Sequence, residues 1–103
     1  MEKIRLGIIG IGNMGSEHCR LILSGQTPEI ALTCVADPRQ DRRDWAQQTL
    51  PAGTGIYADG MSLIRAHACD AVLIATPHEL HPPLAEAALR AGLHVLSEKP
   101  AGV

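Results

Sequence analysis

Aromatic residues are almost absent from this 103-residue chain, which has no phenylalanine, one tryptophan (Trp45) and one tyrosine (Tyr57). Its hydrophobic fraction is nevertheless 46%, so the core has to be built from Ile, Leu, Val and Ala. Such a core favours a parallel sheet covered by helices over a sandwich with aromatic packing. The length suits one small domain and is too short for two.

The chain also lacks the signals of several functional classes. Its formal net charge of −2 gives no reason to expect binding to nucleic acid or attraction to a membrane surface. No apolar stretch approaches the roughly 20 residues that a membrane-spanning helix needs, and we expect no secretory leader. Cys19, Cys34 and Cys69 have no metal-ligand spacing, so we expect buried free thiols in a cytoplasmic protein.

Strand-like and helix-like segments alternate along the chain. Runs of apolar and β-branched residues predict strands at 4–9, 30–36, 56–57, 71–75 and 94–97. Helices are predicted at 13–23, 39–48, 61–66 and 82–91, and Gly25 and Gly92 are expected to end the first and the last. This alternation predicts an α/β fold, a doubly wound parallel sheet of Rossmann type with strand order 3-2-1-4-5. Because the chain stops just after its fifth strand, we expect it to be truncated from a longer protein.

A glycine-rich loop, Gly10-x-Gly12-x-x-Gly15, follows the first predicted strand and opens the first helix. In this context the pattern indicates a site for the pyrophosphate of a dinucleotide. Gly10 permits the tight turn, Gly12 lets the backbone approach the phosphates, and Gly15 lets the helix pack closely on the strand. Free N–H groups at the helix start, where Asn13 and Met14 stand, then face the phosphates. The alternative is a glycine turn that holds no ligand.

Asp37 ends the second predicted strand, about 20 residues after the loop, where dinucleotide-binding domains place an acid. A carboxylate there accepts hydrogen bonds from the adenosine ribose and repels a 2′-phosphate, which favours NAD over NADP. Arg39, Arg42 and Arg43 follow at once, and arginine can clamp a phosphate, so NADP stays open. The alternatives are an Asx turn at Asp37 before Pro38 and a solvated helix face that carries the three arginines.

Two polar segments come after the fourth and fifth predicted strands. Ligands of open α/β sheets lie outside the carboxyl ends of the strands, which places both segments beside the nicotinamide end of the cofactor. The residues predicted to line the cofactor there are Ala75, Thr76, Pro77, His78, His81, Glu98, Lys99 and Pro100. Lys99 can hydrogen-bond the substrate oxygen and steady its developing charge, or it can be a simple exposed lysine. His78 and His81 could share a metal from one helix face, but no further ligands accompany them, so we expect no metal site.

Four segments together resemble the Gfo/Idh/MocA oxidoreductases, a family that includes glucose–fructose oxidoreductase and inositol dehydrogenase. They are 7–15, 35–37, 75–78 with His81, and 91–100, of which the Glu98-Lys99-Pro100 ending is much the most specific. The resemblance implies that residues 1–103 are the Rossmann domain of an NAD(P)-dependent dehydrogenase. Such an enzyme transfers hydride between the cofactor and a sugar, inositol or related polyol, with Lys99 as the catalytic residue. His78 departs from the family pattern, in which asparagine is frequent.

Members of that family continue into a second α/β domain, which supplies most of the substrate pocket and of the oligomer interface. The resemblance therefore implies that the parent protein is an enzyme and that this chain alone is inactive. An incomplete sheet would leave an apolar face uncovered, which would favour self-association as a homo-oligomer. The alternative function is a non-catalytic nucleotide-binding or sensor module, and a methyltransferase that uses S-adenosylmethionine is a more distant one.

Overall fold

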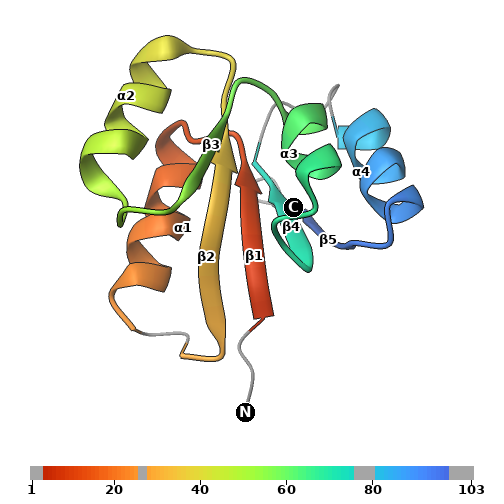
Figure 1. The fold of residues 1–103 in the computed structure, drawn as a ribbon, viewed down its shortest axis with the longest axis horizontal. Helices are drawn as coiled ribbons and strands as arrows, with labels where there is room; N and C mark the ends of the chain where they lie inside the picture. The colour runs from red at the N-terminus through yellow and green to blue at the C-terminus, as the bar shows by residue number, and fades with distance from the viewer. Residues whose placement is uncertain (1–3, 26–27, 76–80, 98–103) are drawn as a thin grey trace, which may run out of the picture.

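The computed structural model describes residues 4–25, 28–75 and 81–97, in which strands and helices alternate (Figure 1). The strands are β1 (Ile4–Ile9), β2 (Ile30–Ala36), β3 (Gly55–Tyr57), β4 (Ala71–Ile74) and β5 (His94–Ser97). The helices are α1 (Asn13–Leu23), α2 (Gln40–Thr49), α3 (Gly60–Ala66) and α4 (His81–Arg90). Each predicted element is present, and its bounds differ from the prediction by at most one residue at either end.

All of these strands pair in parallel in the order β3-β2-β1-β4-β5, which confirms the predicted doubly wound topology. Ile9, the last residue of β1, lies beside Ala36 of β2 and Ile74 of β4. The carboxyl ends of these three strands therefore meet at one edge of the sheet. After β3 the chain crosses back over the sheet and forms β4 on the other side of β1. The carboxyl ends of β1 and β4 therefore lie at a switch point, which is where open α/β sheets bind ligands.

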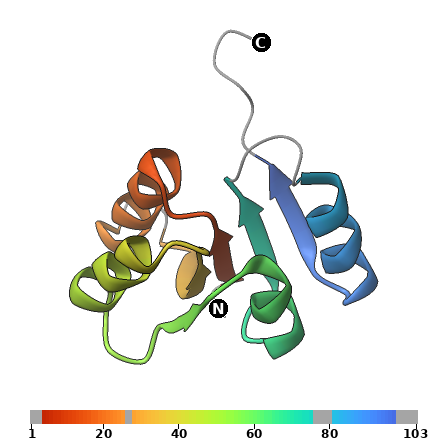
Figure 2. The same cartoon turned by 90° about the horizontal axis from the view of Figure 1, so that it is seen from above.

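Helices cover both faces of the sheet, α1 and α2 on one face and α3 and α4 on the other (Figure 2). The first face buries a cluster that includes Ile8, Cys19, Val35 and Ala46. The second buries Ile9, Leu63, Val72, Leu84 and Ala88, among others. The buried members of both clusters are aliphatic residues, alanine or cysteine, as the composition predicted, and Trp45 and Tyr57 pack only at the margins.

The helix ends follow the predicted glycine and proline signals. Gly25 and Gly92 come just after α1 and α4 and have φ angles of +85° and +84°, in the left-handed region that glycine adopts without strain. Pro82 and Pro83 stand in the first turn of α4, where the missing N–H of proline has no helical partner to lose. Among the described residues, no helix is both long enough and apolar enough to span a membrane.

Part of the sheet surface stays apolar and open. Ile4 and Leu96 are each 49% exposed. Together with residues of β1, β2, β4 and β5 they line a hollow of about 160 Å³, whose full lining is Ile4, Leu6, Ile30, Ala71, His94 and Leu96. This is the kind of uncovered face that the sequence led us to expect, and self-association through it stays a prediction.

Gly7, in the middle of β1, packs against two buried thiols. A Cβ atom at Gly7 would lie 2.8 Å from the Sγ of Cys34 and 3.1 Å from the Sγ of Cys69. Both cysteines are free and buried, as is Cys19, which confirms the prediction for all three. Burial raises the pKa of the Cys19 thiol to about 11, so this group stays protonated at neutral pH and serves as a core residue.

Gly7→Ala should destabilise the fold, because the added methyl group has no room beside the two sulfur atoms. Overpacking of this kind costs about 1–3 kcal/mol, measured as a loss in the free energy of unfolding in urea. In a Cys34→Ala background, which lacks the nearer sulfur, the same substitution should cost less. An equal loss in both backgrounds would contradict the packing described for Gly7.

Candidate cofactor site

The glycine loop runs from the end of β1 into α1, and it requires glycine at two positions, one for its backbone conformation and one for close packing. The Gly10 N–H donates to the Ala36 carbonyl at 2.7 Å, while φ at Gly10 is +93°. A Cβ atom at Gly15 would overlap the Gly10 carbonyl group. Gly10 therefore makes the turn and Gly15 permits close packing of α1 on β1, as the sequence predicted for each.

Gly12 is the N-cap of α1 and lies exposed, with no atom within 4 Å of the place where a Cβ would be. The first helical hydrogen bond runs from the Ser16 N–H to the Gly12 carbonyl at 2.9 Å. The N–H groups that precede it have no carbonyl partner within the helix. The first turn of α1 contains no acidic residue, so the positive end of the helix dipole is available to an anion.

Asp37 is 7% exposed and connects the loop to the segment before α2. Its Oδ2 accepts a hydrogen bond from the Ile11 N–H at 2.9 Å, and its Oδ1 accepts one from the Arg39 N–H at 2.9 Å. The second bond is the Asx turn that the sequence offered as an alternative. A carboxylate has about four lone-pair sites, so Asp37 can make both bonds and still accept from ribose hydroxyl groups.

The arginines after Asp37 differ from one another in their contacts. Arg39 has an exposed side chain that pairs with Asp41 at 3.1 Å. Arg43 is half-buried and donates to the Asp37 carbonyl at 2.8 Å. The interpretation of this cluster as a solvated helix face therefore fits Arg39 and is wrong for Arg43.

The sequence named Arg42 only as a possible phosphate clamp or part of a solvated face, and its contact with the glycine loop was missed. Its side chain is half-buried, its Nε donates to the Ile11 carbonyl at 2.6 Å, and its guanidinium carbon lies 5.1 Å from the centre of the Trp45 ring. The solvated-face interpretation is therefore wrong for Arg42 as well. A signal was present, because Arg42 stands three residues before the only tryptophan, a spacing that brings helical side chains together.

A mainly apolar cavity of about 270 Å³ opens beside the loop. Its walls come from the ends of β1 and β2, the segment after Asp37 and the starts of α3 and α4: Ile9, Gly10, Ala36, Pro38, Asp59, Gly60, Met61, Pro83 and Leu84. Asp59 caps α3 by accepting from the Ser62 N–H at 2.8 Å, and this bond holds the pKa of Asp59 below its usual range. The cavity could not be predicted because separate segments of the chain build it.

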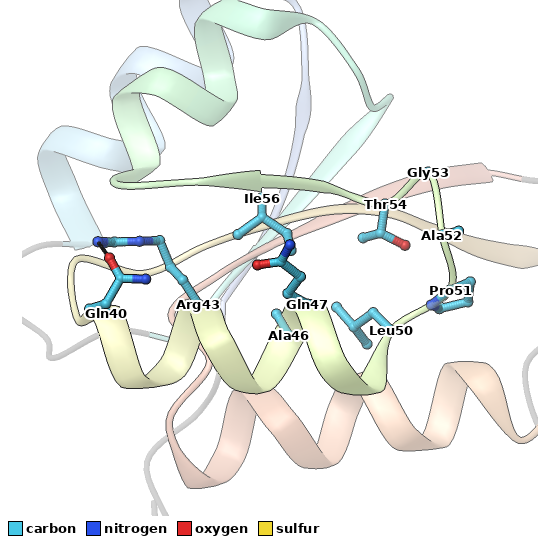
Figure 3. A pocket seen from close by; sticks show the side chains of 10 residues that line it. All are labelled: Gln40, Arg43, Ala46, Gln47, Leu50, Pro51, Ala52, Gly53, Thr54 and Ile56. Atoms are coloured by element: carbon cyan, nitrogen blue, oxygen red, sulfur yellow. Dashed lines mark hydrogen bonds between the residues drawn. The ribbon is translucent and has the colours of Figure 1, made fainter.

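A larger cavity, of about 720 Å³, lies at the sheet edge between α2, the turn that follows it and β3 (Figure 3). At one end Arg43 donates to Gln40 at 2.7 Å, and at the other Leu50 and Thr54 face the groove. No residue of the glycine loop lines this cavity, and we therefore place the candidate site at the smaller one.

The remaining predicted residues come after strand ends or open helices. The Ala75 N–H donates to the Ile9 carbonyl at 2.8 Å, which places the segment after β4 next to the end of β1. Asn13 and Met14 begin α1, and His81 begins α4. Six predicted residues lie outside the described ones: Thr76, Pro77, His78, Glu98, Lys99 and Pro100.

In residues 4–25, 28–75 and 81–97, no three His, Cys, Asp or Glu side chains gather as metal ligands.

Comparison with known proteins gives matches along nearly the whole chain. The family model described as "Oxidoreductase family, NAD-binding Rossmann fold" matches residues 4–103. Inositol 2-dehydrogenase 4 of Saccharopolyspora erythraea is 38% identical over 102 residues, which cover 96% of this chain and 29% of that protein. The rhizopine catabolism protein MocA of Rhizobium meliloti is 42% identical over 106 residues, which cover 100% of this chain and 31% of that protein.

A solved structure extends the likeness to three dimensions. The scyllo-inositol dehydrogenase of Lactobacillus casei, with bound NAD(H) and scyllo-inositol, matches with a TM-score of 0.87 at 31% identity, over 99% of this chain and 29% of that one. The chain thus spans about 30% of the length of these relatives. The matched residues include the glycine loop, Asp37 and the segments at the ends of β4 and β5. The chain belongs to the oxidoreductase family with the NAD-binding Rossmann fold, the Gfo/Idh/MocA family that its motifs resemble.

Proposed function

We propose that residues 1–103 form the cofactor domain of an oxidoreductase that transfers hydride between NAD and an inositol, sugar or related polyol. The observation that carries this proposal is that the Asp37 carboxylate, which follows β2, binds the glycine loop beside the open helix N-terminus at Gly12. The substrate class comes from relatives named as inositol dehydrogenases. Because those relatives are much longer, the proposal includes a second domain that completes the substrate pocket.

Three parts of the cofactor correspond to three features of the site. The pyrophosphate binds at the start of α1, where Gly12 leaves space and the first-turn N–H groups face an anion. The adenosine ribose binds against Asp37, which has lone pairs to accept its hydroxyl groups. The adenine, a flat ring with apolar faces, occupies the cavity beside Pro38 and Met61.

The charges around the ribose favour NAD over NADP. Asp37 places a negative charge where a 2′-phosphate would lie. The nearby arginines already have partners within the chain: Arg39 pairs with Asp41, and Arg43 binds the Asp37 carbonyl and Gln40. A 2′-phosphate would have to displace one of these contacts as well as approach a carboxylate.

We assign the hydride-transfer end of the site to the segments after β4 and β5. Ile74 pairs with Ser97 at the ends of these strands, which supports a common location for the two segments. Thr76, Pro77 and His78, with His81, would flank the nicotinamide ribose, and Glu98 and Pro100 would flank the catalytic Lys99. The bound nicotinamide supplies the hydride acceptor or donor. Lys99 would hydrogen-bond the substrate oxygen and stabilise the charge that builds on it during hydride transfer.

The proposal also covers the cellular location and the assembly of the protein. Three free, buried thiols suit the reducing cytoplasm, where we place it. The exposed apolar side chains of Ile4 and Leu96 would bury themselves in contact with a second domain or a second copy, so we propose a homo-oligomer for the whole protein.

The chain should bind NADH more tightly than NADPH, as followed by energy transfer from Trp45, its only tryptophan. Asp37→Asn keeps the shape of the side chain and removes the charge. Its one remaining oxygen can still accept from the Ile11 N–H, while the Arg39 N–H loses its acceptor. The preference for NADH should fall about tenfold. Glu86→Gln, which removes a carboxylate from the exposed surface of α4, should leave both affinities unchanged. A folded chain that binds neither cofactor at millimolar concentration would refute the site, and equal losses for both cofactors would remove Asp37 from ribose recognition.

Gly12→Ala should weaken NADH binding about tenfold or more without lowering the melting temperature, because the new methyl group meets only the incoming pyrophosphate. Gly15→Ala is the matched comparison and should lower the melting temperature, since its methyl group overlaps the Gly10 carbonyl. Titration and thermal unfolding of both variants measure these effects. Unchanged NADH affinity in Gly12→Ala would place the pyrophosphate elsewhere.

In a longer protein that contains this chain, Lys99→Ala should abolish polyol-dependent NADH formation while NADH affinity stays within a few-fold of the unsubstituted protein. The physical reason is that Lys99 stabilises charge on the substrate oxygen, which the cofactor alone does not need. Initial rates with inositols and a separate NADH titration measure the two quantities. Retained turnover would remove Lys99 from the chemistry, and an unsubstituted protein that binds NADH without any turnover would favour the sensor function.

A further inference from the structure

The peptide groups on both sides of Ile11 are already held before any ligand binds. On one side the Ile11 N–H donates to Asp37 Oδ2 at 2.9 Å. On the other side the Ile11 carbonyl accepts from the Nε of Arg42 at 2.6 Å. Asp37 lies directly after β2 and Arg42 belongs to the first half of α2, so the middle of the glycine loop is fixed from the neighbouring β-α unit.

The contact of Arg42 has a consequence for the next residue of the loop. The Ile11 carbonyl and the Gly12 N–H belong to one planar trans peptide, and they point in opposite directions. Because the carbonyl faces Arg42, the Gly12 N–H faces away from α2. Within the part of the chain that the structure describes, this N–H donates to no backbone carbonyl. Gly12 is exposed, so an anion can approach this N–H at the start of α1.

The Trp45 ring lies close to the Arg42 side chain. Its centre lies 5.1 Å from the guanidinium carbon of Arg42 and 5.8 Å from that of Arg20 on α1. The ring also packs on the buried cluster beneath α1 and α2. A planar guanidinium can stack on a ring and direct one N–H at a carbonyl, whereas a lysine ammonium has no such fixed geometry.

We propose that Arg42 is a positioning residue for the cofactor pyrophosphate, which fixes the Gly12 N–H as a phosphate donor through the Ile11 carbonyl, and that Trp45 holds Arg42 in place. The inference rests on the proposed function and adds a residue that acts through the backbone rather than on the ligand. Ligands that carry a pyrophosphate depend on Arg42, and ligands that end at the ribose do not.

The test compares NADH, ADP and adenosine by isothermal titration calorimetry on wild-type, Arg42→Gln and Arg42→Lys chains. Loss of one charged hydrogen bond corresponds to a change of about tenfold in affinity, so Arg42→Gln should weaken NADH and ADP by about that factor and leave adenosine unchanged. Arg42→Lys keeps the charge but not the directed N–H, and it should lose nearly as much. Arg90→Gln removes an exposed arginine from α4 and should change none of the affinities.

Trp45→Leu provides a second route if the Arg42 variants fold poorly, because it keeps Arg42 and removes only the ring that holds it. It should weaken NADH and ADP in the same direction, by a smaller factor, with adenosine again unchanged. Wild-type affinity for NADH in Arg42→Lys would show that charge rather than the directed hydrogen bond matters, and would overturn the proposal. An equal loss for adenosine would overturn it too, since the effect would then be a general loosening of the fold. A wild-type chain that binds no NADH would refute the proposed function itself, which is a separate result.

Discussion

The Asp37 carboxylate joins the end of β2, the glycine loop and the segment before α2. One oxygen accepts the Ile11 N–H and the other accepts the Arg39 N–H, at 2.9 Å each. Hydrogen bonds to a charged acceptor are among the stronger ones in proteins, and burial of Asp37 strengthens them further. The direction in which α2 leaves β2 depends on this group, and so does the position from which Arg42 reaches the loop.

A structural role and a recognition role therefore coincide at Asp37. Replacement of Asp37 by a cationic phosphate-binding residue, arginine or lysine, also removes the acceptor of the Ile11 N–H. That N–H would be left buried without a partner at a cost of about 1–3 kcal/mol. A change of cofactor preference at this position thus requires compensation within the loop. The arginines on α2 cannot supply it, because they are donors and the Ile11 N–H needs an acceptor.

The sequence was sufficient for the fold because its signals are local. Apolar runs in the strands, glycine after α1 and α4, and the paired prolines in α4 each identify an element from a few neighbouring residues. The same holds for Gly10, Gly15 and the Asx turn at Asp37. The contact between Arg42 and Ile11 joins residues far apart in the chain, and its existence depends on which way a long side chain turns. The cavity beside the loop and the packing of Gly7 against two thiols could not be predicted either, because they too bring together residues that are far apart in the chain.

The sheet tapers from its centre to both edges. β1 and β2 have 6 and 7 residues, whereas the outer strands β3 and β5 have 3 and 4. A strand from another molecule that aligned with β3 would gain few main-chain hydrogen bonds, and short edge strands are one way in which proteins avoid open-ended growth into fibres. A partner that contacts the domain at β3 would therefore rely mainly on side chains, whose shape and chemistry can discriminate between partners where a bare backbone cannot.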